Sequence, residues 1–513
     1  MLSGTLLDYV LLAVALSFSI ILFARRRSRS ALPPGPKGHF IIGNMLDIPS
    51  ETDSGEVYAK WGEVYGSDIV SATVFGKTIV IINTYEKAVE MLDRKGNIYS
   101  DRPRIPMAGE LMGCKLSMGI MPYGRRLRSS RKMVYQELGS NHAIRAFFPH
   151  EERMARRFAR RLLEAPTYFS EHITLHADAI ILKIAYGHEA VSFNDDFIQN
   201  ATRSMEEMGK GCEPSEFLVN AIPMLSYVPS WFPGAGFKKL AAEWRKHYNV
   251  MVDAPFNLVK QQMAAGVYGE SFVSKWLQKG ISLEEEDYLK HASGAMIGAG
   301  GETTSIVLHV FFLMMTLHPD IQKQAQSELD RVIGRDRLPS FEDRAQLPYI
   351  DAIRKEILRT HPPVPLSLPH CTTQADIQDG YYIPERSAIV VNIWNITHNP
   401  TTHKRPHDFN PSRFLGPNPE RNPGDVIFGF ESVLYQTAIT LTGLRLADAS
   451  LFITIATALS LFNITPITEG GKPILPIFEA IPGPVSRIKP FRCNIAPRDG
   501  TRKAAAVIAL PGQ

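Results

Sequence analysis

The chain has 513 residues, of which 44% are hydrophobic and 21% are charged. This is an ordinary globular composition, and the length allows a large buried core. The net charge of +4 is too small to indicate nucleic-acid binding, and no basic run lies beside aromatic residues. The four cysteines are widely spaced, so neither a zinc site nor a disulfide framework is indicated, and free thiols in a reducing compartment are expected.

The N-terminal segment predicts a membrane anchor. Residues Tyr9 to Ala24 are almost wholly apolar, and four arginines follow among residues 25–29. With the leucines before Tyr9, the stretch approaches the roughly 20 residues that span a bilayer. A cleaved signal peptide is the alternative, but there the charges precede the apolar run. We therefore expect an anchor over residues 1–24, with a lumenal N-terminus and a cytoplasmic body.

A basic, Pro-rich linker is expected over residues 25–37. It contains Leu32-Pro33-Pro34-Gly35-Pro36, and prolines make a stiff spacer because they fix φ. The folded body would then be residues 38–513. If that body is cytoplasmic, the glycosylation machinery never meets the sequons at Asn200, Asn395 and Asn463.

The periodicity of the body predicts a mainly helical fold with a small β region. Runs of β-branched residues between Thr73 and Ile82 predict a hairpin that turns at Gly76-Lys77. A Pro- and Asn-rich loop is expected over residues 398–425. Apolar residues at helical spacing predict helices, and short apolar runs predict strands. The expected helices are 85–94, 125–138, 150–163, 284–317, 320–334, 347–360 and 444–461, and the expected strands lie within 375–383 and 388–391.

The long helix 284–317 contains Ala299-Gly300-Gly301-Glu302-Thr303-Thr304 in an apolar context. Each mid-helix glycine costs about 1 kcal/mol, so the pair suggests a distortion or a close approach to something flat. An acid and a hydroxyl at that point suit proton delivery to a bound oxygen species. The alternative is a helix-packing groove, in which Glu302 pairs elsewhere and Thr303 bonds back to the preceding turn.

A second motif carries charges among apolar residues. Glu356 and Arg359 share one face of the helix 347–360, at i and i+3. Ion pairs of this kind contribute little to stability on a surface. Here the neighbouring residues are apolar, so we expect the pair to be buried. Arg413, in the Phe409 to Phe414 stretch, would complete a three-member network, because a buried charge needs a partner.

In this order and at these separations, the motifs resemble a microsomal-type fungal cytochrome P450. The resemblance implies that fold behind one transmembrane helix in the endoplasmic reticulum membrane. It also implies a haem cofactor and a separate NADPH-dependent flavoprotein reductase that docks on a basic proximal face. The reaction implied is insertion of one oxygen atom of O2 into a hydrophobic small molecule, such as a secondary metabolite, an aromatic compound or a xenobiotic.

The resemblance also implies residue roles. Glu302 and Thr303 would serve a proton relay. Arg131 and His370 match positions that bond the haem propionates, although Leu127 stands where the family usually has a Trp. The network that supports the haem would comprise Glu356, Arg359 and Arg413. The apolar substrate pocket would be lined by residues 105–121, 295–299 and 364–368.

The chain departs from the family at the haem loop, which in the family reads Phe-x-x-Gly-x-Arg-x-Cys-x-Gly. The loop begins as expected at Phe428 and resumes at Gly443, but residues 431–442 do not match. Counted back from the last helix, the position of the ligating cysteine holds Leu441; counted forward from Phe428, it holds Tyr435. The block is therefore both substituted and lengthened, and no protein ligand for the metal is assigned.

Three explanations remain open for this block. A wrong exon junction or a retained intron would leave a normal enzyme in the cell, and the intact flanks favour that explanation. A non-catalytic relative would be unable to bind haem through a thiolate. The third explanation makes Tyr435 a replacement oxygen ligand, as tyrosinate is in catalase-type haem proteins.

Overall fold

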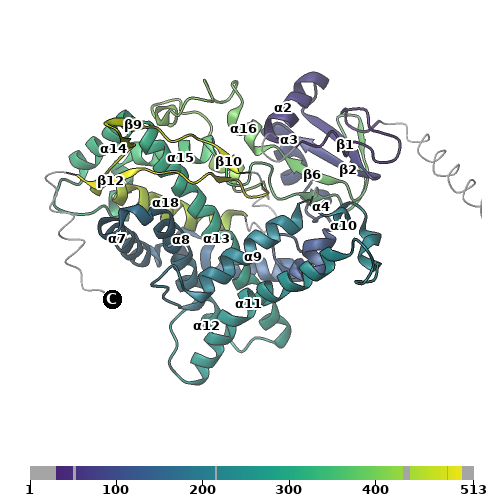
Figure 1. Ribbon diagram of the computed structural model, residues 1–513, viewed down its shortest axis with the longest axis horizontal. Coiled ribbons are helices and arrows are strands. Elements are labelled where there is room, and N and C mark those ends of the chain that lie inside the picture. Colours follow the sequence, from purple (N-terminus) through teal and green to yellow (C-terminus); the bar gives the residue numbers. More distant parts are fainter. Residues whose placement is uncertain (1–30, 50–53, 214–215, 431–439, 482, 499–513) are drawn as a thin grey trace, which may run out of the picture.

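The computed structural model describes residues 31–49, 54–213, 216–430, 440–481 and 483–498 (Figure 1). The expected anchor 1–24 and Tyr435 lie outside the described residues, as does the side chain of Leu441. The described end of the expected linker is fixed to the body, because the carbonyl oxygens of Pro33 and Pro34 accept hydrogen bonds from Ser71.

The expectation of a mainly helical fold with small sheets is confirmed. The α-helices are α2 (Ser54–Tyr65), α3 (Tyr85–Ala88), α4 (Gly96–Tyr99), α5 (Arg125–Leu138), α6 (Asn141–Arg145), α7 (Phe148–Glu164), α8 (Phe169–Tyr186), α9 (Asp196–Cys212), α10 (Leu218–Ala221), α11 (Gly236–Ala264), α12 (Phe272–Leu277), α13 (Leu283–Leu317), α14 (Pro319–Val332), α15 (Pro348–Thr360), α16 (Ile393–His398), α17 (Gly424–Ile427) and α18 (Thr440–Leu461). Shorter 3₁₀ and π turns are η2 (Val89–Arg94), η3 (Pro106–Leu111), η4 (Cys114–Leu116), η5 (Pro166–Tyr168), η6 (Pro223–Tyr227), η7 (Phe341–Gln346) and η8 (Pro411–Phe414).

Local chemistry explains the ends of these helices. At the start of α13, the Ser282 hydroxyl accepts from the Glu285 N–H while the Glu285 carboxylate accepts from the Ser282 N–H, which is a capping box. Helix α15 ends at Thr360, shortly before two prolines. The helix expected over 85–94 is α-helical only to Ala88 and continues as the π-helical turn η2.

The main sheet has four strands in the order β1 (Ile69–Val74), β2 (Lys77–Ile82), β6 (Ala388–Val391) and β3 (His370–Cys371). Strand β2 is antiparallel to β1 and parallel to β6. The hairpin turns at Phe75-Gly76, one residue before the expected place, since those two residues have positive φ angles of 46° and 80°. The two-stranded sheets pair β4 (Asp376–Gln378) with β5 (Tyr381–Ile383), β7 (Phe462–Thr465) with β12 (Asn494–Pro497), β8 (Ile467–Glu469) with β9 (Lys472–Ile474), and β10 (Ala480–Ile481) with β11 (Arg487–Ile488).

Helix α13 runs through the centre of the molecule and belongs to both large apolar cores. It packs on α5, α8, α9, α11, α14, α15 and α18, with its first half in one core and its second half in the other, while the main sheet lies at one end of the molecule (Figure 1). Among the described residues, Leu283–Leu317 and Gly443–Leu461 are long and apolar enough to cross a membrane. Most of each helix is buried inside the protein, as expected of core helices.

Candidate functional site

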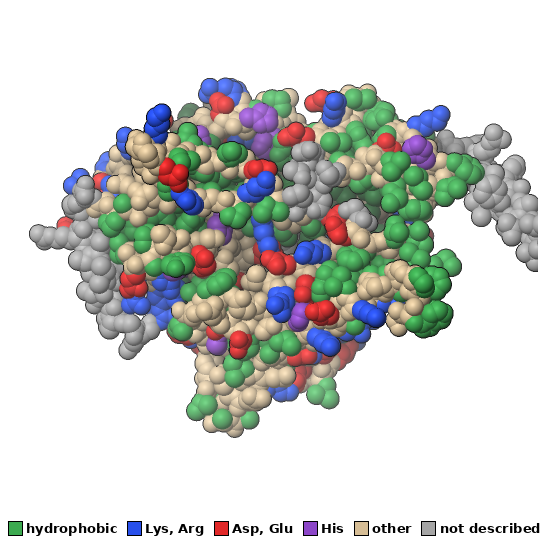
Figure 2. All heavy atoms as spheres, viewed as in Figure 1, with side chains coloured by type: hydrophobic (Ala, Val, Ile, Leu, Met, Phe, Trp, Pro, Cys, Tyr) green, Lys and Arg blue, Asp and Glu red, His purple; other side chains and the backbone are tan. Residues whose placement is uncertain are grey.

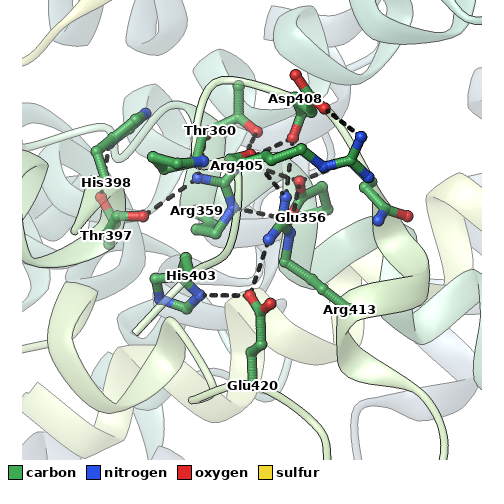
Figure 3. Close-up of polar contacts among 12 residues, drawn as sticks. Glu356, Arg359, Thr360, Thr397, His398, His403, Arg405, Asp408, Arg413 and Glu420 are labelled. Carbon is green, nitrogen blue, oxygen red and sulfur yellow. Dashed lines mark hydrogen bonds and ion pairs between the residues drawn. The ribbon is translucent and has the colours of Figure 1, made fainter. Parts of the chain in front are cut away.

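The structure brings Glu356, Arg359 and Arg413 together in the core (Figure 3). The Arg359 guanidinium donates to both carboxylate oxygens of Glu356, at 2.8 and 2.9 Å. Arg413 donates to the same carboxylate from its Nε, at 3.1 Å. Glu356 and Arg359 are fully buried. One carboxylate thus faces two guanidinium groups inside the protein.

The excess positive charge of this network is met by a second carboxylate and by carbonyl oxygens. Arg413 also donates to Glu420, at 2.8 Å. Arg359 and Arg413 donate to the carbonyl oxygens of Thr397, Lys404, Arg405, Pro406 and Asp408. Glu420 in turn bonds Nδ1 of His403 at 3.1 Å, and burial lowers the pKa of His403 to about 4, so the imidazole is neutral at neutral pH. The network therefore fixes the course of the expected loop 398–425.

Glu302 and Thr303 lie in the middle of α13. Their contacts are those expected if this part of the helix is a packing groove. Glu302 accepts from two nitrogens of Arg487 in β11, at 3.0 and 2.6 Å. A third nitrogen of Arg487 donates to Glu206 of α9 at 2.8 Å. The Thr303 hydroxyl donates to the Ala299 carbonyl at 2.7 Å, which leaves its oxygen able to accept a further hydrogen bond. Their role in a proton relay stays a prediction.

The two glycines of α13 allow α8 to approach closely. A Cβ atom at Gly300 would lie 2.6 Å from the Ile181 side chain, and one at Gly301 would lie 1.8 Å from Oδ1 of Asp178. Asp178 is buried, and its pKa is raised to about 8, first by burial and then by the charge of Glu302. Packing against α8 is thus sufficient reason for both glycines.

Arg131 and His370 lie within electrostatic reach of one another, and a third basic residue joins them. Arg131 is buried in α5, and His370 lies in β3, where its Nδ1 donates to the Tyr99 carbonyl at 2.9 Å. The pKa of His370 lies well below its ordinary value, because the ring is buried and because Arg102 and Arg131 are positive. Arg102 donates to the carbonyl oxygens of Leu368 and Pro369, at 2.7 and 2.9 Å.

Sequence reasoning missed Arg102, because a single arginine in a polar turn carries no specific signal. Arg102, Arg131 and His370 come from three segments that only the fold brings together. Two guanidinium groups and a neutral imidazole are suited to an anion with two carboxylates, and arginine binds carboxylates in a fixed geometry. This basic cluster fits the propionate edge of a haem.

A haem-thiolate site also requires a cysteine thiolate that ligates the iron, and the cysteines of this chain do not meet that requirement. None of the four lies in α18 or in the segment that precedes it. Burial raises the pKa of Cys371 to about 11 and the pKa values of Cys212 and Cys493 to about 12, so these thiols stay protonated. The buried Cys114 has a raised pKa for the same reason. Of the two positions counted for the ligand, Tyr435 lies outside the described part of the chain, and Leu441 lies in the first turn of α18.

Much of the expected substrate pocket belongs to one apolar core cluster. Met107, Ala108 and Met112 of the 105–121 segment are buried together with Met296 and Ile297 of α13. From the 364–368 segment, the Leu368 side chain faces Gly119, because a Cβ at that glycine would lie 3.6 Å from it. Segments 105–121 and 295–299 thus share one core cluster, and segment 364–368 meets the first of them at Gly119.

Comparison with known proteins agrees with this architecture. The family model described as Cytochrome P450 matches residues 33–430. The chain belongs to the cytochrome P450 family. Cytochrome P450 monooxygenase 208 of Postia placenta is 40% identical over 490 residues, which cover 95% of this chain and 94% of that protein.

Two further cytochrome P450 relatives match over similar lengths. Cytochrome P450 monooxygenase claR of Ampulloclitocybe clavipes is 38% identical, covering 94% of this chain and 89% of that protein. Cytochrome P450 monooxygenase ppsD of Aspergillus oryzae is 37% identical, covering 93% and 91%. The family match ends at residue 430, one residue before the block that departs from the cytochrome P450 haem loop.

Proposed function

We propose that the gene encodes a haem-dependent monooxygenase that inserts one oxygen atom from O2 into a hydrophobic small molecule. The observation that carries the proposal is 40% identity, over 95% of the chain, to a protein named a cytochrome P450 monooxygenase. The basic cluster of Arg102, Arg131 and His370 supports it, because it fits the two carboxylates of haem. The apolar cluster beside α13 suits a hydrophobic ligand.

The abrupt break between two matching flanks argues that residues 431–442 replace a haem loop that the working enzyme contains. Both flanks match the family, and the supporting network of Glu356, Arg359 and Arg413 is complete. The competing function is a membrane-bound, non-catalytic relative, and the missing cysteine favours it.

Sequencing the transcript across Phe428 to Gly443 tests the proposal. We expect a message that encodes an Arg-x-Cys-x-Gly loop and a purified product with the carbon-monoxide spectrum of thiolate-ligated haem. A transcript that matches this chain, together with a purified protein that lacks that spectrum, would overturn the proposal in favour of the non-catalytic relative. Haem bound without a thiolate spectrum, and lost in a Tyr435→Phe variant, would identify Tyr435 as the ligand.

Electrons are proposed to come from an NADPH-dependent flavoprotein reductase. Arg125, Arg128 and Lys132 of α5 are exposed, and their spacing of three and four residues places them on one face of the helix. The opposite face of α5 is buried and carries Leu127 and Arg131. A basic surface backed by Arg131, which we propose bonds a haem propionate, suits an acidic electron donor.

The endoplasmic reticulum membrane is the proposed location. Apolar side chains gather at the end of the molecule that carries β1, β2 and α10 (Figure 2). Large apolar residues of the N-terminal part and of the segment after α10 are more than 70% exposed, namely Phe40, Ile41, Leu46, Met224, Tyr227 and Trp231. An exposed apolar surface near the expected anchor suits contact with lipid.

A further inference from the structure

Asn220 is a buried amide that joins three separate parts of the fold. Its Oδ1 accepts from the Met107 N–H at 3.0 Å, and its Nδ2 donates to the carbonyl oxygens of Gly211 and Glu213, at 3.0 and 3.1 Å. Its own carbonyl accepts from Nζ of Lys77 in β2, at 2.8 Å. One residue of the four-residue helix α10 thus holds η3, the C-terminal end of α9 and the hairpin.

The turn η3 depends on neighbouring elements for its shape. It has only six residues, begins with Pro106 and has the π-helical pattern, which is uncommon in proteins. The Met107 N–H, at its first turn, is satisfied by Asn220. At the other end, Arg245 of α11 donates to the carbonyl oxygens of Glu110 and Leu111, at 2.5 and 3.0 Å. Side chains from α10 and α11 therefore hold both ends.

The side chains of η3 and of the residue after it pack into one apolar core cluster with α9, α11 and α13. Met107 and the adjacent Met112 are fully buried, and Met112 lies against Gly211, where a Cβ would come within 2.6 Å of its sulfur. Met296 of α13 belongs to the same cluster. Methionine is flexible and fills irregular gaps, so a wall made of it takes its position from the backbone.

We propose that Asn220 is a positioning residue of the substrate pocket, which holds η3 against α9 and so sets the wall that faces α13. The inference rests on the proposed function, since it assumes that this apolar region receives the substrate. Removing the amide leaves the Met107 N–H and two carbonyl oxygens without their partner. The turn η3 is then released at one end, while Arg245 still holds the other.

Hydrogen exchange on the full chain in detergent, read by mass spectrometry, tests the clamp. In Asn220→Ala we expect exchange over residues 107–112 to rise about tenfold or more, because three buried hydrogen bonds are lost. Exchange in α13 and α15 should stay unchanged. In Lys77→Met, which leaves the Asn220 side chain intact, residues 107–112 should exchange at the wild-type rate. Unchanged exchange in Asn220→Ala, or a rise throughout the chain, would overturn the inference.

Binding of the apolar dye Nile red tests the consequence for the pocket. We expect the dissociation constant to change at least about fivefold in Asn220→Ala. It should stay unchanged in Asn200→Ala, a matched asparagine whose side chain donates to the Asp196 carbonyl one turn earlier in α9. Local release of η3 with unchanged dye affinity would show that η3 is not a pocket wall and would also overturn the inference. A wild-type chain that binds no dye would contradict the proposed apolar pocket, whereas the exchange result would still decide whether Asn220 clamps η3.

Discussion

Glu151 offers a test of how the core responds to pH. Its carboxyl group is fully buried in α7, which packs against α18. Burial raises the pKa of Glu151 from 4.5 to about 8; the Ser450 hydroxyl opposes this rise, and the charge of Asp448 adds to it. The carboxyl group is therefore protonated in the folded protein at neutral pH and ionised in the unfolded chain.

The direction of the pH effect follows from the raised pKa. The folded state binds the proton more tightly than the unfolded state, so the contribution to stability is fully present below about pH 4.5. It is lost progressively as the pH rises through about 8. One pKa unit corresponds to about 1.4 kcal/mol, so the whole loss is at most about 5 kcal/mol, of which about 3 kcal/mol is already lost at pH 7.

The variant Glu151→Gln isolates this effect, because the amide has the same shape and does not ionise. We expect its thermal unfolding midpoint to be close to the wild-type value at pH 5 and clearly higher at pH 8.5. Glu164→Gln, at the exposed end of the same helix, is the matched control and should follow the wild-type profile. Parallel profiles for the wild type and Glu151→Gln between pH 5 and pH 8.5 would refute the assignment of a raised pKa.

Three further predictions concern charge and packing. Glu356→Gln should cost about 3–5 kcal/mol of unfolding free energy in denaturant titrations, because two buried guanidinium groups lose their shared carboxylate; a loss below about 1 kcal/mol would contradict the network. Gly301→Ala should cost about 1–3 kcal/mol, and adding Asp178→Ala should recover part of that loss, since the clash is with the Asp178 carboxyl; additive losses in the double variant would contradict this. The double variant Arg128→Glu, Lys132→Glu should weaken reductase binding at least about tenfold at low salt and less at high salt, as measured by surface plasmon resonance. Equal affinities of the variant and the wild type would exclude this face of α5 as the reductase-binding surface.

The parts of the fold that the sequence predicted are those with a local signal. Helix α5 has the predicted bounds, and α13 begins within one residue of its predicted start, where Ser282 and Glu285 form a capping box. The contact of Arg413 with Glu356 was also predictable, because two charges in apolar surroundings need each other.

Other parts depend on contacts between distant segments and left no local pattern. Helices α8, α9 and α11 were not predicted, and α8 is apolar on nearly all sides because it is buried between α7 and α13. The sequence did not show why residue 301 is a glycine. The structure shows that a side chain there would collide with Asp178 of α8. Arg102 lies near Arg131 and His370 because the segment that follows α4 pairs with β3, a contact between residues that are far apart in the sequence.

The contacts that Arg359 and Arg413 make with main-chain carbonyl groups have a consequence for how this region tolerates change. Five of the carbonyl groups that they bind belong to residues whose own side chains take no part in those bonds. A carbonyl oxygen is present whatever the residue type, so these two arginines hold the path of the chain without dictating its side chains. Substitutions at an exposed position such as Lys404 should therefore accumulate freely, whereas insertions or deletions between residues 397 and 408 should not.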